Sequence, residues 1–521
     1  MLAMVQAAGL EGIEGFPVEV QAWVQKVQMN PRMSVVGLPD AALREARDRV
    51  RAAIRASGYV LPGLLAITIN LTPARQRKGE GAAFDLPMAL AILACLDPPL
   101  IPPEALRGVA ALGELTLAGE VRPVHGALAA GETLAAAESV ARLLVPWDNA
   151  EAAAIGARGT LEVVGIGSLA EAVAVVSGSA RPRAVEVDLS RVLEAPARED
   201  ALCLQDVRGA DGAKEAVLVA AAGGHDLVLV GPPGAGKTML ARRLPGLLPA
   251  LTLEEVLEVS RVHAAANGGD PRAHEDLVRR RPFRAPHHTA SYAALVGGGP
   301  LPRPGEVSLA HKGVLFLDEL PEFSARSLEA LREPLEGRTI TISRARQAVC
   351  FPADFQLVAA MNPCPCGYLG DPRRRCSCPP LAAERYQARL SGPLIDRIDL
   401  VSRLQPVPAA LLQGSPPADD PRTSERVRER VVAARALQQE RAGLLNARLD
   451  ARALVRTLAP TPAARRTLTR AGEQNLLSGR GLAKVQRIAR TLADLEGRAK
   501  VSEEDVSAAV YLRLGERAAA A

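Results

Sequence analysis

The sequence has few aromatic residues, no long apolar run and no cysteine pattern typical of a disulfide scaffold. Aromatic residues make up 3% of the 521 residues. The longest apolar run, 88–96, is far shorter than the about 20 residues that cross a bilayer. Residues 1–12 also lack the basic start and long apolar core of a secretory signal. We therefore expect no membrane partner and a cytoplasmic location.

Lysine is also scarce, because only seven of the 63 basic residues are Lys. The formal net charge is +5, and the bias toward Arg follows from genome composition as readily as from a nucleic-acid partner. Charge alone therefore identifies no partner. A chain of this length exceeds one hydrophobic core, so we expect several domains.

A phosphate-binding loop is predicted at Gly231–Thr238, which reads GPPGAGKT and fits the pattern G-x-x-x-x-G-K-[ST]. A strand is predicted before it, at 227–230, and a helix after it, at 239–244. We expect positive φ at all three glycines of the loop, so that backbone N–H groups face phosphate oxygens. Lys237 is expected to bridge the β- and γ-phosphates of ATP, and Thr238 to bind Mg²⁺. The alternative is a Gly/Pro-rich turn with a chance Lys-Thr. The residues predicted to bind the nucleotide here are Gly231, Pro232, Pro233, Gly234, Ala235, Gly236, Lys237, Thr238 and Met239.

The segment 206–238 resembles AAA+ ATPases, in which the corresponding stretch surrounds the adenine base, and this resemblance implies nucleotide contact at Val207. A second signature, Gly313–Leu320, reads GVLFLDEL and is typical of a buried parallel strand that ends in two acids. Asp318 is expected to hold Mg²⁺ through water, and Glu319 to polarise the attacking water. A structural strand that happens to end in two acids is the alternative.

Two further residues complete the expected ATPase centre. A strand predicted at 355–361 ends at Asn362, the position called sensor one in AAA+ proteins, where an amide would orient the attacking water. Arg397 stands where ring ATPases carry an arginine that neutralises transition-state charge in the neighbouring subunit. The alternative is a local ion pair of Arg397 with Asp396 or Asp399. If Arg397 acts between subunits, the enzyme must oligomerise to be active.

Four of the seven cysteines crowd into residues 364–378, in the arrangement C-x-C, nine residues, C-x-C. Four thiolates on so short a hairpin can close a tetrahedron around zinc, and the arginines of the loop are expected to lower their pKa values. Reduced free thiols and a redox pair are the alternatives. The predicted zinc ligands are Cys364, Cys366, Cys376 and Cys378, and the predicted core cysteines are Cys95, Cys203 and Cys350.

Residues 1–180 show the pattern of an α+β domain with its own core, including a helix at 41–57 and a half-buried strand at 65–71. The order of elements resembles the Lon-protease-like fold, also called ribosomal S5 domain 2-like. In that alignment the catalytic serine and lysine positions fall on Ala83 and Leu128, so the resemblance implies a non-catalytic domain. A basic loop follows the predicted strand. It either contacts DNA phosphates or is merely solvated, and its basic residues are Arg75, Arg77 and Lys78.

Helical periodicity returns at residue 424, and Ser502 before three acids is typical of a helix N-terminus. The AAA+ resemblance implies that this region is a helical lid. Residues 478–497 resemble the sensor-two helix, whose arginine meets the γ-phosphate. An ordinary solvated arginine face is the alternative. The arginines considered for that role are Arg487, which we favour, and Arg480 and Arg490.

Residues 279–323 resemble the ComM/YifB family of magnesium-chelatase-like AAA+ proteins, and the resemblance covers essentially the whole chain. It implies a homo-hexameric ring helicase that uses ATP and Mg²⁺ to drive branch migration on single-stranded or branched DNA, in natural transformation and homologous recombination. A metal site at the adjacent histidines is a weaker alternative to DNA contact there. The residues expected to contact DNA phosphates are Arg284, His287, His288 and Lys312.

The predicted fold is α/β, with an AAA+ P-loop NTPase core, a Lon-like N-terminal α+β domain and a C-terminal helical lid. The expected boundaries are 1–180 for the N-terminal domain, 181–200 for a linker, 201–405 for the core, 406–423 for a second linker and 424–521 for the lid. The leading function is an ATP-driven DNA motor. One alternative is the ATPase subunit of a magnesium chelatase, which normally lacks a Lon-like domain and a cysteine hairpin. Another is a non-enzymatic platform, which the complete nucleotide signatures disfavour.

Overall fold

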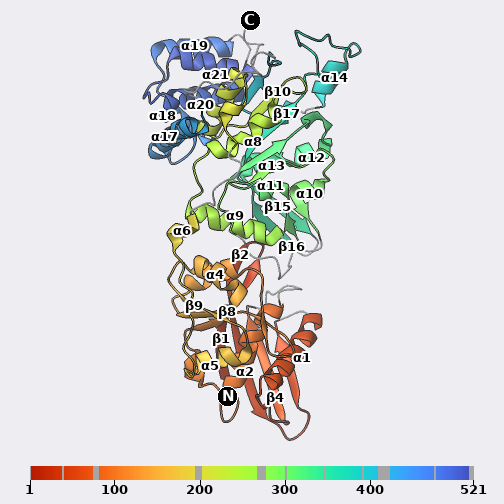
Figure 1. Ribbon diagram of the computed structural model, residues 1–521, viewed down its shortest axis with the longest axis vertical. Helices are drawn as coiled ribbons and strands as arrows, with labels where there is room; N and C mark the ends of the chain where they lie inside the picture. Colours follow the sequence, from red (N-terminus) through yellow and green to blue (C-terminus); the bar gives the residue numbers. More distant parts are fainter. Residues whose placement is uncertain are drawn as a thin grey trace. The chain divides into compact units, whose positions relative to one another are not determined.

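The chain divides into two compact units (Figure 1). The computed structural model describes residues 2–37, 40–73, 81–193, 202–266, 277–299, 302–344, 347–389, 392–408, 423–473 and 477–514. Described residues within 1–195, 252–279 and 343–351 form the first unit, and those within 196–251, 280–342 and 352–521 form the second. Outside the described residues lie Arg75, Arg77, Lys78, residues 194–200 of the first expected linker and 409–422 of the second.

The first unit is built on a seven-stranded mixed sheet with the order β3-β4-β2-β1-β5-β8-β9. β1, β2 and β4 pair antiparallel, and the other neighbours pair parallel. The half-buried strand predicted at 65–71 is confirmed as β4. The bounds are β1 Leu2–Glu11, β2 Glu14–Lys26, β3 Arg32–Val36, β4 Leu65–Thr72, β5 Val109–Ala111, β8 Arg142–Pro146 and β9 Glu162–Ile166.

Helices complete the core of the first unit. The helix predicted at 41–57 is α1, Asp40–Ala56, and the most buried helix is α2, Asp85–Ala94, in which every residue is buried. Burial raises the pKa of Asp85 to about 7, although Arg49 lies 2.7 Å from its carboxylate. The other helices of this unit are α3 Ala127–Ala135, α4 Trp147–Ala157, α5 Leu169–Val176, α6 Leu189–Leu193 and α9 Leu253–Ala266.

Part of the first expected linker is regular structure. α6 falls within it and buries Val192 in the core of the first unit, where Val185 also packs. The chain therefore stays attached to this unit at least as far as residue 193.

The second unit holds a five-stranded sheet with the order β11-β14-β17-β10-β18, in which all neighbouring strands are parallel. The strands predicted from apolar runs around the two nucleotide signatures are confirmed as β10, β14 and β17. Parallel strands place their carboxyl ends at one edge, where ligands bind in such sheets. The bounds are β10 Leu227–Val230, β11 Phe283–Arg284, β14 Val314–Leu317, β17 Gln356–Met361 and β18 Leu400–Arg403, with helices α7 Asp211–Gly223 and α8 Lys237–Leu247 beside them.

The C-terminal part of the second unit is helical. The helix start predicted at Ser502 is confirmed, because Ser502 Oγ accepts from the backbone N–H of Asp505 at 3.3 Å. No described helix is both long and apolar enough to cross a membrane. The helices are α17 Ser424–Ala442, α18 Ala451–Thr457, α19 Pro462–Glu473, α20 Gly479–Leu495 and α21 Glu503–Leu514.

A buried polar network joins these helices to the sheet. His225 precedes β10, and its ring contacts Asp399 at 3.2 Å and Thr491 at 2.9 Å. Lys484 of α20 completes the network at 2.7 Å from Asp399. Because burial leaves these groups without water, each depends on its partners, which fixes α20 beside the sheet.

Candidate functional site

The phosphate loop joins β10 to α8 at the carboxyl edge of the second sheet. Gly234 and Gly236 have φ of +76° and +88°, which residues with a side chain rarely adopt. The prediction of positive φ is wrong for Gly231. Glycine is needed at position 231 for lack of space, because a Cβ there would lie 2.9 Å from the carbonyl oxygen of Leu404. Among the other loop residues, the buried ones are Pro232 and Ala235, and the exposed ones are Pro233 and Met239.

Lys237 opens α8, and its ammonium group is buried inside the loop. Nζ donates to the carbonyl oxygens of Gly231 at 2.7 Å and Pro232 at 3.0 Å, and to Oδ1 of Asn362 at 3.1 Å. Burial lowers the pKa of Lys237, while the two acids that follow β14 act in the opposite direction. The loop thus holds a desolvated cation at a helix N-terminus, an arrangement suited to an anionic phosphate.

Thr238 and Asp318 lie in contact although they are 80 residues apart in the sequence. Thr238 Oγ1 donates to Asp318 Oδ2 at 2.9 Å, and Asp318 Oδ1 accepts from the backbone N–H of Glu319 at 3.0 Å. A hydroxyl and a carboxylate are hard oxygen donors of the kind that Mg²⁺ prefers. These two side chains therefore fit the metal ion that the family resemblance implies.

Glu319 contacts His288, for which the sequence predicts a DNA contact or, less well, a metal site, and not a partner in the ATPase centre. Its Oε2 lies 3.0 Å from Nδ1 of His288, a contact that a neutral Nδ1–H tautomer and an imidazolium can both make. β11 and β14 are parallel neighbours, so the segments after them emerge at the same edge. The ring of His287 stacks on that of His288 with centroids 4.1 Å apart, and its Nδ1 lies 2.8 Å from Thr289 Oγ1. No local pattern encodes the contact with Glu319, because it arises from strand pairing.

Asn362 and Val207 complete the group around the loop. Met361 pairs with Val230 in the parallel ladder, so Asn362 leaves the sheet beside the phosphate loop. Val207 is buried, and a Cβ added to Gly236 would lie 4.0 Å from its Cγ1. The predicted site residues that the structure brings together are Val207, Lys237, Thr238, Asp318, Glu319 and Asn362.

Arg397 lies outside this group. Its Nη2 donates to Glu336 Oε1 at 2.5 Å. Of the two acids considered as local partners, Asp396 lies 3.7 Å from Arg513, and Asp399 pairs with a lysine of α20 at 2.7 Å. A role for Arg397 in a neighbouring subunit stays a prediction.

The three arginines considered on α20 have different surroundings. Arg487 is partly buried, and its Nε donates to the carbonyl oxygen of Leu449 at 2.9 Å. Arg490 is fully buried and lies 3.0 Å from Asp494, so it belongs to the packing of the helical region. Arg480 is exposed. Contact of any of them with a phosphate stays a prediction, and the burial of Arg490 makes it the least suited.

Comparison with known proteins identifies the family. Competence protein ComM of Haemophilus influenzae is 40% identical over 514 residues, which cover 98% of this chain and 97% of that protein. The chain belongs to the ComM/YifB family. Uncharacterized protein YifB of Escherichia coli, a second ComM/YifB relative, is 40% identical over 528 residues, which cover 99% of this chain and 98% of that protein.

Magnesium-chelatase families also match the ComM/YifB chain. "Subunit ChlI of Mg-chelatase" matches residues 20–149, "Magnesium chelatase, subunit ChlI" matches 203–412, and "Magnesium chelatase, subunit ChlI C-terminal" matches 421–513. The Magnesium-chelatase 67 kDa subunit of Chlorobaculum tepidum is 27% identical over 166 residues, 31% of this chain and 23% of that protein. The second match contains the phosphate loop and both acids. The parallel sheet and these matches fit an AAA+ ATPase core that uses ATP and Mg²⁺.

Two of the basic residues expected to contact DNA in this ComM/YifB chain are held in ion pairs. Arg284 binds both carboxylate oxygens of Glu306, at 2.6 Å and 2.7 Å. Lys312 Nζ lies 3.1 Å from Asp354, which Arg448 also binds at 2.9 Å. Burial alone would raise the pKa of Asp354, but the surrounding cations, Arg448 first, outweigh it and hold the pKa well below its usual range. DNA would have to compete with these pairs.

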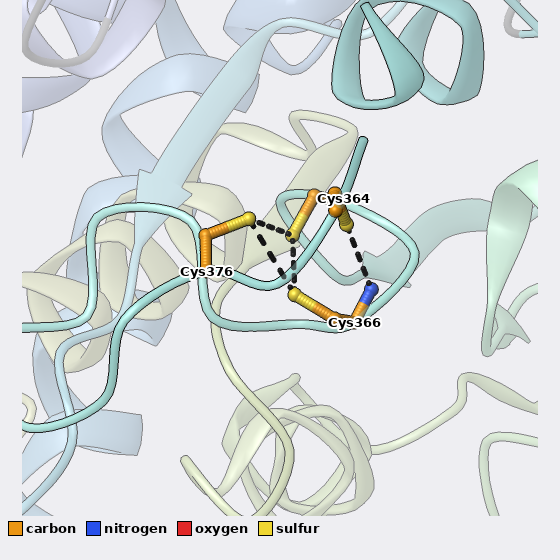
Figure 2. Close-up of side chains that lie close together, drawn as sticks. Cys364, Cys366 and Cys376 are labelled. Atoms are coloured by element: carbon orange, nitrogen blue, oxygen red, sulfur yellow. Dashed lines mark hydrogen bonds between the residues drawn. The ribbon is translucent and has the colours of Figure 1, made fainter. Parts of the chain in front are cut away.

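The four clustered cysteines come together as predicted (Figure 2). Cys364 Sγ lies 3.4 Å from Cys366 Sγ and 3.7 Å from Cys376 Sγ, and the last two are 3.5 Å apart. Cys378 Sγ accepts from the backbone N–H of Cys366 at 3.4 Å. None of the seven cysteines, all of which lie in the described ranges, is joined in a disulfide. The expected lowering of the thiol pKa values is found for Cys366, whose pKa falls to about 5, although backbone hydrogen bonds and not the loop arginines are its main cause. The expectation is wrong for Cys376 and Cys378, whose pKa values are raised, that of Cys378 to about 12.

The other cysteines differ in burial. Cys95 is buried as predicted, and burial raises its pKa to about 11. Cys203 is partly buried. The core prediction is wrong for Cys350, which is exposed on β16, Gln347–Pro352, beside the buried Val349. Side chains alternate between the two faces of a strand, so an apolar neighbourhood in sequence does not bury every member.

Proposed function

We propose that this protein is a ring-forming, ATP-dependent DNA motor, a branch-migration helicase acting in natural transformation and homologous recombination. The observation that carries the ATPase part is the meeting of Lys237 and Asn362 with the Thr238–Asp318 pair at one sheet edge. The DNA part is supported by the near full-length similarity to a protein named for competence. It is also what the family resemblance implies.

Each residue around the phosphate loop has its own proposed role in ATP hydrolysis. Lys237 contacts the β- and γ-phosphates, whose charged oxygens replace the carbonyl acceptors that it has now. Thr238 and Asp318 would hold Mg²⁺, which supplies neutralisation of phosphate charge. Glu319 accepts the proton of the attacking water, and Asn362 orients that water.

Arg397 is proposed to complete the centre of the neighbouring subunit, and Arg487 to contact the γ-phosphate from α20. The pairing of Arg397 with Glu336, which is not one of the residues around the phosphate loop, is compatible with action in trans. Such a centre is complete only in an oligomer, and we propose a homo-hexamer because the family resemblance implies one. Neutralisation of transition-state charge by an arginine is worth about 10³-fold or more in turnover.

The remaining parts have proposed supporting roles. Residues 1–180 would be a Lon-like domain without peptidase activity, because Ala83 and Leu128 supply neither a nucleophile nor a base. The C-terminal helices would act as a lid over the nucleotide. Single-stranded or branched DNA would be bound in the ring through phosphate contacts, in the cytoplasm.

A magnesium-chelatase ATPase subunit is the second candidate. It is favoured by the three matched magnesium-chelatase families. The two candidates share the ATPase centre and differ in what stimulates it.

The rate of ATP hydrolysis by the purified full chain distinguishes the two candidates. It is measured with four-way junctions, three-way junctions, single-stranded DNA or a porphyrin added. Stimulation by branched DNA with ATP-dependent junction unwinding is expected, and Glu319→Gln is the matched inactive control. Stimulation by the porphyrin alone would favour the chelatase. A chain that hydrolyses ATP while it stays monomeric and indifferent to every DNA would overturn the motor.

A further inference from the structure

We propose that Cys364, Cys366, Cys376 and Cys378 bind one Zn²⁺ ion as a structural tetrathiolate site. The four Sγ atoms all lie within 4.8 Å of one another. The three thiols labelled in Figure 2 point toward a common centre. No other group of at least three His, Cys, Asp or Glu residues among the described ones has this property.

The sulfur spacing matches a tetrahedral zinc site. Zn–S bonds of about 2.3 Å put neighbouring sulfurs of a tetrahedron about 3.8 Å apart. Three of the observed separations are 3.4, 3.5 and 3.7 Å. A disulfide would require about 2.05 Å instead. Four soft thiolates leave no open coordination position, which makes the site structural and not catalytic.

The chain around the cluster has no regular secondary structure of its own. Residues 362–380 contain no helix or strand. Within them Cys364 is fully buried, whereas Pro372 and residues 373–375 are exposed. The loop has a local turn in which Asp371 accepts from the backbone N–H of Arg373 at 2.7 Å. So long a segment without its own secondary structure needs another source of order, and a metal bound by both of its ends supplies it.

The cluster also contacts the phosphate loop. A Cβ added to Gly367 would lie 2.6 Å from Cδ of Pro233. Cys364 follows Asn362 by two residues, and Gln387 Nε2 donates to the intervening carbonyl of Pro363 at 2.9 Å. The zinc therefore fixes both the chain after Asn362 and a surface against which the phosphate loop packs. This positioning role rests on the proposed function, whereas the metal site itself does not.

Metal analysis of the full chain, purified under reducing conditions, tests the site. We expect one zinc per chain, a loss of zinc in Cys364→Ser and Cys376→Ser, and full zinc in the matched control Cys350→Ser, whose thiol is exposed. Zinc near zero in the wild type, with the four thiols freely titratable or joined in disulfides, would overturn the site. If the serine variants fail to fold, Co²⁺ exchanged into the wild-type chain decides instead. Strong sulfur-to-cobalt charge-transfer absorption is expected, and its absence counts against four thiolate ligands.

The positioning role has a separate readout. Gly367→Ala keeps every cysteine but adds a methyl group at a backbone φ of +84° and against Pro233. We expect normal zinc content, retained ATP binding and turnover lowered about tenfold. Turnover unchanged both in this variant and after zinc removal would overturn the positioning role. A wild-type chain that hydrolyses no ATP under any condition would instead end the proposed function, while its zinc content would still decide the metal site.

Discussion

His288 Nδ1 lies 3.0 Å from Oε2 of Glu319, the residue proposed to accept the proton of the attacking water. The side chain of His288 is 30% exposed and that of Glu319 is 53% exposed, so the contact is open to solvent. The backbone of Glu319 has φ +52°, a conformation that is unusual for a residue with a side chain and tends to concentrate at functional sites. A carboxylate in this contact is less available as a base.

Removal of the His288 side chain is therefore expected to raise the basal rate of ATP hydrolysis. A hydrogen bond to a charged group contributes about 1.5 kcal/mol, and solvent exposure reduces this to about 1 kcal/mol. His288→Ala should increase basal turnover about fivefold. The comparison variant is His287→Ala, which removes the ring stacked on His288 and its contact with Thr289 but keeps both partners of the His288–Glu319 contact. A fall in turnover of His288→Ala to the level of Glu319→Gln would show that His288 supports the reaction instead.

Lys237 and Glu319 should separate binding from turnover. Lys237→Ala removes the buried cation of the phosphate loop and is expected to abolish ATP binding. Glu319→Gln keeps size and hydrogen bonding but removes the base, so ATP should bind normally while turnover falls about 100-fold or more. Equilibrium binding of a fluorescent ATP analogue and phosphate release measure the two quantities. Normal turnover of Glu319→Gln would remove Glu319 from its role.

Arg397 should act across a subunit boundary. Arg397→Ala is expected to lower turnover about 10³-fold and to leave ATP binding intact. Mixing it with Lys237→Ala should restore part of the activity, because one mixed interface combines an intact loop with an intact arginine. Glu336→Gln is the matched control, since it breaks the ion pair but keeps the guanidinium. No rescue in rings verified to be mixed would contradict action in trans.

Asp354 should make the second unit sensitive to acid. Its folded-state pKa is depressed, so the unfolded chain binds more protons at low pH and stability rises with pH there. The stabilisation is complete at neutral pH and is lost as pH falls below about 4, the unfolded value. Asp354→Asn leaves its cationic partners unpaired and should cost about 3 kcal/mol at pH 7.

Urea unfolding at pH 7 and pH 3 measures this difference. Unfolding is followed by circular dichroism. The difference in free energy of unfolding between wild type and Asp354→Asn should be smaller at pH 3 than at pH 7. Tryptophan fluorescence supplies the internal control, because both tryptophans, Trp23 and Trp147, lie in the first unit. A gap that persists unchanged at pH 3 would show that the ion pairs are not its source.

The sequence alone was enough to predict the phosphate loop, the strands around it and the four-cysteine cluster. Each of these is encoded locally, by residue types at fixed spacing or by apolar periodicity. The contact of Thr238 with Asp318 was also foreseeable, because parallel strands of a nucleotide-binding sheet end at a common edge.

The folded structure was needed for the contacts that depend on which strand lies next to which. It placed His288 against Glu319 and Arg397 against Glu336, and it put the loop at Gly231 so close to Leu404 that a side chain has no room. The folded structure also shows that Cys350 lies on the exposed face of its strand. Strand order and burial are set by packing of the whole unit, and no window of sequence contains that information.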